Sequence, residues 1–114
     1  MAIALALAGM CPACSAMAAT HVVVIERMSF GTMPDGVVAG DTIEWRNADV
    51  VPHTATAKDA GFDVTLAPGA SASVVVSHAG RYSVLCTYHP GMTAELRVAT
   101  NGNAPPPRAS NGTK

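Results

Sequence analysis

Three side chains of metal-binding types stand close together near the end of this chain, within residues 86–92. Cys86 offers a thiolate, His89 an imidazole and Met92 a thioether, and His53 supplies a second imidazole from further upstream. Soft sulfur ligands hold Cu(I), and imidazole also suits Cu(II), so this mixture keeps both oxidation states of copper bound. Two imidazoles and one thiolate with a weak axial thioether are the ligand set of a blue-copper electron-transfer site.

Each of these four residues, taken singly, has an ordinary structural explanation. A lone cysteine in a strand is usually a small buried hydrophobe, and a lone methionine usually fills a core. Zinc is the metal to exclude, because structural zinc takes Cys and His in closed tetrahedral sites and copper stands higher in the affinity order. The four residues together therefore predict one copper ion per chain, bound by His53, Cys86, His89 and Met92.

Length and composition limit the class of protein. A chain of 114 residues is enough for one domain. Hydrophobic residues make up 49% of the chain and charged residues 13%, which excludes a largely disordered protein. A formal net charge of −1 provides no global field that would attract a nucleic acid.

Residues 1–18 have the pattern of a signal peptide that is removed on export to the periplasm. An apolar, alanine-rich run is followed by Ala16-Met17-Ala18, a small-x-small pattern typical of cleavage, so we expect the mature chain to begin at Ala19. No Lys or Arg precedes Arg27, so the usual positive start of a leader is missing and we expect the true start further upstream. The apolar run is too short to span a membrane as a helix.

The cysteines agree with this interpretation. Cys11 and Cys14 form a C-x-x-C pattern of the kind found in redox dithiols, but both lie in the segment that we expect to be removed. Cys86 is then the only cysteine of the mature chain. A single thiol in an oxidising compartment needs protection, which a bound metal would supply.

The part of the chain after residue 20 is typical of an all-β sandwich. Short runs rich in Val, Ile and Thr alternate with Gly, Pro, Asp and Asn. Seven or eight strands form a two-sheet domain over residues 19–100, and the proline-rich tail 101–114 is predicted to be disordered. The predicted strands cover residues 21–27, 42–46, 52–57, 62–66, 70–76, 81–86 and 94–100.

Strand parity places the cysteine. Successive side chains of a strand point to opposite faces, so Cys86 shares the core face with Tyr82 and Val84, at the rim of the sandwich. His21 and His78 have no comparable neighbours in the sequence and are predicted to be surface residues.

The residues upstream of His53 strengthen the copper prediction. With Trp45, Asn47 and Pro52 before it, and the spacing of residues 86–92 after it, the chain resembles the cupredoxin family from roughly residue 21 to residue 100. Cupredoxins are small blue-copper electron carriers with a Greek-key β-sandwich fold. Two residues separate Cys86 from His89, and two separate His89 from the methionine, a short spacing that is similar to the amicyanin-like branch of the family.

The resemblance implies a role for each ligand. His53, Cys86 and His89 would form the trigonal plane and Met92 the axial ligand. The protein would be a monomeric one-electron carrier and not an enzyme, since four protein ligands leave no open position for a substrate. Its partners would be redox proteins, such as a dehydrogenase donor and a c-type cytochrome acceptor, that dock transiently near His89.

Two other functions stay open at this point. The same ligands would serve a periplasmic protein of copper trafficking or storage, which hands over the ion rather than an electron. A metal-free β-sandwich interaction module is the third possibility, and adding copper would leave its melting temperature unchanged.

Two positions depart from the family pattern. Thr54 stands where amicyanin-like proteins often have Asn, and we expect its N–H to approach the sulfur of Cys86 and its hydroxyl to join the two ligand loops. Tyr88 stands where the family commonly has Pro, which restores a backbone donor close to the thiolate. We expect this donor to stabilise Cu(I) and to raise the reduction potential.

Overall fold

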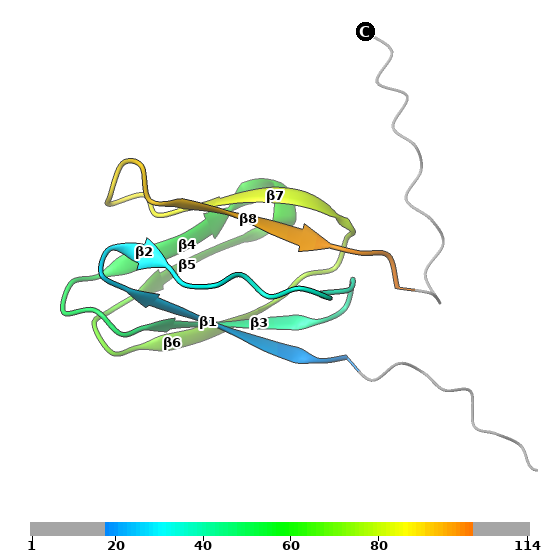
Figure 1. The fold of residues 1–114 in the computed structure, drawn as a ribbon, viewed down its shortest axis with the longest axis horizontal. Helices are drawn as coiled ribbons and strands as arrows, with labels where there is room; N and C mark the ends of the chain where they lie inside the picture. Colours follow the sequence, from blue (N-terminus) through cyan, green and yellow to red (C-terminus); the bar gives the residue numbers. More distant parts are fainter. Residues whose placement is uncertain (1–17, 102–114) are drawn as a thin grey trace, which may run out of the picture.

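The computed structural model describes residues 18–101, which form two four-stranded sheets packed face to face (Figure 1). One sheet has the order β2 (Ser29–Phe30), β1 (Thr20–Glu26), β3 (Thr42–Asn47), β6 (Ser71–Val75). The other has the order β5 (Phe62–Leu66), β4 (His53–Ala57), β7 (Gly80–Leu85), β8 (Thr93–Val98). The predicted all-β sandwich is therefore confirmed, whereas the leader up to residue 17 and the tail from residue 102 lie outside the described residues.

All seven predicted strands are present, with ends that differ from the prediction by at most two residues. The eighth strand, β2, was not predicted because it has only two residues and pairs through a tight turn with β1. That turn consists of Arg27 and Met28, which both have positive φ values of 53° and 60°. Between β4 and β5 lies a single turn of 3-10 helix, Lys58–Ala60.

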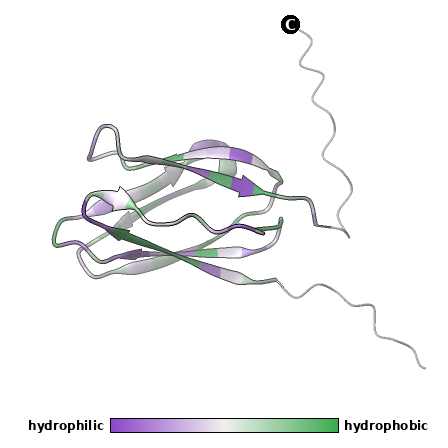
Figure 2. Ribbon diagram, in the orientation of Figure 1, coloured by the Kyte–Doolittle hydropathy of each residue, from purple (hydrophilic) through white to green (hydrophobic). Residues whose placement is uncertain are grey.

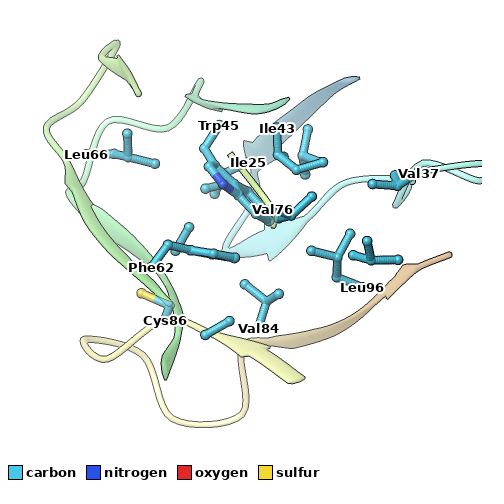
Figure 3. Packing of buried hydrophobic residues seen from close by; sticks show 14 of the residues in the cluster. Ile25, Val37, Ile43, Trp45, Phe62, Leu66, Val76, Val84, Cys86 and Leu96 are labelled. Carbon is cyan, nitrogen blue, oxygen red and sulfur yellow. The ribbon is translucent and has the colours of Figure 1, made fainter. Parts of the chain in front are cut away.

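The core lies between the two sheets. Trp45 is fully buried between the sheets near Phe62 (Figure 3), and the two ring centroids are 5.7 Å apart. The ring centroid of Phe30 lies 5.8 Å from that of Trp45. Along the strands, the ribbon changes between polar and apolar colours instead of keeping one colour over a whole strand (Figure 2). Burial alternates along β1, β3, β7 and β8, which turns one face of these strands to the core and the other to solvent, whereas β4 is buried along its whole length.

The predicted orientation of Cys86 is confirmed. Val84 and Cys86 are buried, whereas Ser83 and Leu85 between them are exposed. Cys86 lies next to the end of β7, at the edge of the apolar cluster, with its sulfur near Phe62 in the view of Figure 3. The thiol can therefore be sheltered by the core and still reach a loop at the rim.

The prediction that His78 is a surface residue is confirmed, whereas that for His21 holds only in part. His78 is exposed, but Nε2 of His21 lies 2.8 Å from Oδ2 of Asp41, and the His21 side chain is only 17% exposed. The two residues lie 20 positions apart, on β1 and just before β3. Pairing of β1 with β3 creates this contact, which the local sequence around either residue does not reveal.

The two ends of the sandwich carry different features. The loop between β7 and β8, which contains the metal-binding residues, lies at one end, while β1 begins and β8 ends at the other (Figure 1). Within residues 18–101, no helix is long and apolar enough to cross a membrane.

Candidate metal centre

The side chains of His53, Cys86 and His89 meet at one end of the sandwich. One ligand atom from each lies within 4.8 Å of the other two. The sulfur of Cys86 is 3.7 Å from Nδ1 of His53 and 3.3 Å from Nδ1 of His89. His53 is fully buried and Cys86 is 4% exposed, whereas His89 is partly exposed. The group thus has one side in the core and one side toward solvent.

Three strand ends position His53, Cys86 and Met92, and His89 lies in the loop between the last two. His53 is the first residue of β4, Cys86 follows the last residue of β7, and Met92 precedes the first residue of β8. The N–H of Cys86 donates to the carbonyl of Met92 at 3.0 Å, and the N–H of Met92 donates to the carbonyl of His89 at 3.1 Å. These bonds close the loop and bring the buried Met92 to the other three residues. Gly91 provides the positive φ of 87° that the turn requires.

The loop that carries His53 is shaped by the buried side chain of Asn47. Its Nδ2 donates to the carbonyl of Val51 at 2.8 Å and to that of Leu66 at 3.0 Å, and its Oδ1 accepts the N–H of Asp49 at 2.9 Å. A buried amide that is bonded in this way holds the chain between β3 and β4 in one conformation. The sequence pattern included Asn47 only as a neighbour of the ligand, without this role.

Asp49 orients the imidazole of His53. Nε2 of His53 lies 2.6 Å from Oδ2 of Asp49, so the Nε2–H donates to the carboxylate and Nδ1 is left to face Cys86. The pKa of Asp49 is lowered by the N–H of Met28 and by His53. Burial alone would lower the pKa of His53. The hydrogen bonds to Cys86 and Asp49 have a larger and opposite effect, so the pKa is raised overall. A carboxylate behind a ligating histidine is a common way to fix its tautomer.

The surroundings of Cys86 favour the thiolate. Burial alone would raise the pKa of Cys86. The N–H of Thr54, at 3.4 Å from the sulfur, and the two imidazoles have a larger and opposite effect, and they lower the pKa to about 6. The backbone N–H of Tyr88 adds to this effect. The thiolate, not the thiol, is the metal ligand, so the protein prepares the ionised sulfur that a soft metal binds. The predicted approach of Thr54 to the sulfur is confirmed.

The hydroxyl of Thr54 joins the two ligand loops, as predicted. It accepts the N–H of Thr87 at 2.9 Å and lies 3.0 Å from the hydroxyl of Thr56. Thr56 in turn donates to Oδ1 of Asp63 at 2.8 Å. Both threonines are 2% exposed although they lie on the outer face of β4. These contacts connect the metal-binding end with β5 in a single polar chain.

The two neighbours of the partly exposed His89 in the chain, Tyr88 and Pro90, are uncharged and exposed. Tyr88 is 51% exposed and its ring stands edge-on to that of His89, with centroids 6.5 Å apart. Pro52 and Pro90 are also exposed, and Val50 is 90% exposed. The exposed Tyr88 and Pro90 therefore flank the partly exposed imidazole of His89 in the chain.

The structure brings together all four residues that the sequence predicted, and it adds Asp49 and Thr56, which sequence reasoning missed. An acidic residue four positions before a candidate ligand was a usable signal for Asp49, because ligating histidines regularly pair with carboxylates. No local signal pointed to Thr56.

The donor set of this site is that of copper. A buried thiolate, two imidazoles and a nearby thioether form the soft and borderline mixture that copper prefers, and structural zinc sites rarely include Met. Residues 1–98 match the family model of the cupredoxin-like domain. The chain belongs to the cupredoxin family, and its four candidate residues are arranged as a copper site.

The similar proteins include several amicyanins. Amicyanin from Paracoccus versutus is 31% identical over 83 residues, which are 68% of this chain and 63% of that protein. The chain therefore spans less than two thirds of the length of this relative. The crystal structure of Paracoccus versutus amicyanin has a TM-score of 0.59 at 30% identity, with 73% of this chain and 82% of that chain covered. A reduced-state structure of an amicyanin mutant has a TM-score of 0.60 at 29% identity and covers 69% and 81% of the two chains.

Proposed function

We propose that this protein is a type 1 copper protein that carries single electrons between redox partners. His53, Cys86, His89 and Met92 hold the ion, and bound copper supplies a one-electron couple. The observation that carries the proposal is the convergence of a thiolate-forming cysteine and two histidines, with ligand atoms within 4.8 Å of one another, in a family of copper proteins. The protein is not itself an enzyme, because four protein ligands leave no place for a substrate.

A rigid frame supports this role. His53 is held by Asp49, the two loops are joined through Thr54, and the loop from Cys86 to Met92 is closed by its own backbone hydrogen bonds. Such fixed ligands keep nearly the same positions in both oxidation states of the metal. Little rearrangement then accompanies each transfer, which suits a carrier rather than a protein that releases its ion.

The electron leaves and enters at the edge of His89. This ring is the ligand with a solvent-facing side, and its uncharged neighbours Tyr88 and Pro90 are exposed beside it. Small, weakly bound interfaces are typical of electron-transfer complexes. We propose that redox proteins dock here transiently, with a dehydrogenase as donor and a c-type cytochrome as acceptor, and that the carrier is an exported, monomeric protein of the periplasm.

The visible spectrum of the protein after addition of copper tests the proposal. An intense blue thiolate-to-copper band is expected, and it should disappear in Cys86→Ala and weaken or shift in His53→Ala. His78→Ala is the matched control, because this histidine is exposed and lies outside the site, and its spectrum should be unchanged. A chain that binds copper without the blue band would contradict the assignment of the ligands.

Copper trafficking or storage is the rival function that the same ligands permit, and a competition experiment separates it. A carrier keeps its copper during repeated oxidation and reduction in the presence of a copper-free competitor protein. Rapid loss of the metal to that competitor, with the blue band present at the start, would contradict the carrier function and support copper trafficking.

A further inference from the structure

A second polar site lies at the end of the sandwich opposite the metal-binding loop, around the buried carboxylate of Asp41 (Figure 1). Oδ2 of Asp41 accepts the N–H of Val38 at 3.1 Å and faces Nε2 of His21 at 2.8 Å. Oδ1 accepts one bond, from the N–H of Ala19 at 2.9 Å. Asp41 is 2% exposed, so its negative charge depends on these partners.

The position of this carboxylate is fixed by the backbone around it. The N–H of Asp41 donates to the carbonyl of Val38 at 2.9 Å, and the carbonyl of Asp41 accepts the N–H of Val76 at 2.9 Å. The N–H of Thr42 donates to the carbonyl of Ala19 at 2.9 Å. Ala19 is therefore held by both its nitrogen and its carbonyl, one residue before β1 begins at Thr20.

The nitrogen of Ala19 is also the atom that the predicted cleavage would convert into a free α-amino group. The pattern Ala16-Met17-Ala18 predicts cleavage of the bond between Ala18 and Ala19. The backbone nitrogen of the expected first residue thus already lies against a buried carboxylate in the uncleaved chain. The leader pattern and the fold point independently to the same nitrogen atom.

We infer that Asp41 is a binding site for the α-ammonium group of a chain that begins at Ala19, so that removal of the leader creates an ion pair with this carboxylate. A leader peptidase hydrolyses the amide: water adds across the C–N bond, Ala18 keeps the carboxylate and Ala19 becomes a protonated amine. The neutral amide N–H of Ala19 is thereby replaced by a charged ammonium donor, which faces the same oxygen, Oδ1 of Asp41. Charge-assisted hydrogen bonds are about twice as strong as neutral ones.

Processing then stabilises the folded protein. All eight strands that the structure describes lie within residues 20–98, so cleavage before Ala19 removes none of them. The new ion pair fixes the start of β1 to the turn before β3, two strands that run parallel and have no short connection to align them. The precursor lacks this charge and is expected to be the less stable form, which suits a chain that must stay unfolded until it is exported.

Two copper-free forms of the chain from Ala19 to Lys114 test the ion pair. One has a free α-amino group, and the other is Nα-acetylated, which restores the uncharged N–H that Ala19 has in the structure. The free amine should melt about 5 °C higher, as expected for one charge-assisted hydrogen bond in a small domain. Equal melting temperatures, or a higher one for the acetylated form, would overturn the inference.

Two variants identify the partner of the amine. Asp41→Asn should abolish the difference between the free and acetylated forms, whereas His21→Ala should keep it, because His21 faces the other carboxylate oxygen. If Asp41→Asn does not fold, NMR titration of the α-amino group in the unsubstituted chain decides the question. A pKa clearly above the ordinary α-amino range, which lies near about 8, supports the pair, and an ordinary or lower one overturns it.

The processing step is tested on the full chain in detergent with a bacterial leader peptidase. Mass spectrometry should show cleavage between Ala18 and Ala19, while cleavage at another bond, or none, would overturn it. None of these measurements uses copper, so their failure would leave the proposed electron carrier intact, and failure of the copper experiment would leave the ion pair intact.

Discussion

Oδ2 of Asp49 lies 2.6 Å from Nε2 of the buried His53. The same carboxylate accepts the N–H of Arg27 at 2.7 Å and the N–H of Met28 at 3.0 Å. The carboxylate therefore connects a candidate copper ligand with the turn between β1 and β2, which belongs to the other sheet. This side chain links the two sheets at the metal-binding end, as Asn47 of β3 also does through the carbonyl of Leu66 on β5.

Replacing this carboxylate should change the copper site without removing a ligand. In Asp49→Asn the amide is less able to hold the His53 ring, and a negative charge near the metal is lost. We expect copper affinity to fall by about tenfold, as for other partners of ligating histidines, and the reduction potential to rise because Cu(II) loses more stabilisation than Cu(I). Copper competition and potentiometry measure the two effects. Asp59→Asn, on the 3-10 turn, is the control, and equal effects from both variants would contradict a specific role for Asp49.

Tyr88 should set the reduction potential through its backbone. The N–H of Tyr88 helps to lower the pKa of Cys86, and a proline at this position has no N–H. Tyr88→Pro should therefore lower the potential by about 60 mV, which corresponds to about 1.4 kcal/mol for the loss of one hydrogen bond. Tyr88→Ala keeps the backbone donor and should change the potential much less. An unchanged or higher potential in Tyr88→Pro would show that the donor has no such effect.

The hydroxyl of Thr54 should matter for stability as well as for the metal. Thr54→Val keeps the N–H that reaches Cys86 but leaves the N–H of Thr87 without its acceptor. We expect the copper-free protein to lose about 1 kcal/mol of unfolding free energy, the usual net contribution of one intramolecular hydrogen bond. Denaturant unfolding measures this loss. Thr65→Val is the matched control, because Thr65 is exposed and directly opposite Thr54 on β5, and a similar loss there would refute the explanation.

Acid should weaken the end of the molecule that contains Asp41. Burial alone would raise the pKa of Asp41. The bond to His21 and the N–H groups of Val38 and Ala19 have a larger and opposite effect, so the pKa lies below the ordinary 3.8. A carboxyl with a lowered pKa contributes stability that is fully present above its unfolded-state pKa and is lost as the pH falls through the folded-state pKa. The copper-free protein should therefore lose stability as the pH falls below about 4.

Denaturant midpoints measured from neutral pH down into this acid range check the prediction, and Asp41→Asn should show a flatter pH profile and a lower midpoint at neutral pH. Asp35→Asn, in an exposed loop, should keep the profile of the unsubstituted protein. An Asp41→Asn profile as steep as that of the unsubstituted chain would assign the acid sensitivity to another group.

The four candidate ligands and most of the strands could be predicted from local patterns in the sequence. Cys86, His89 and Met92 lie within one short loop, so their spacing alone indicates a metal site, and the period-two alternation around Trp45 and Val84 is a local property of strands. Strand parity likewise predicted correctly that Cys86 faces the core. The two residues of β2 were too few to produce a periodic signal.

Only the tertiary structure decided which polar groups meet. His21 and Asp41 are 20 residues apart, Thr54 and Thr87 are 33 apart, and Asp49 reaches a turn 21 to 22 residues away. Hydrogen bonds are short and directional, so a shift of one residue in strand register would separate all of these pairs. Their formation depends on how the two sheets align and pack, which no local pattern in the chain specifies.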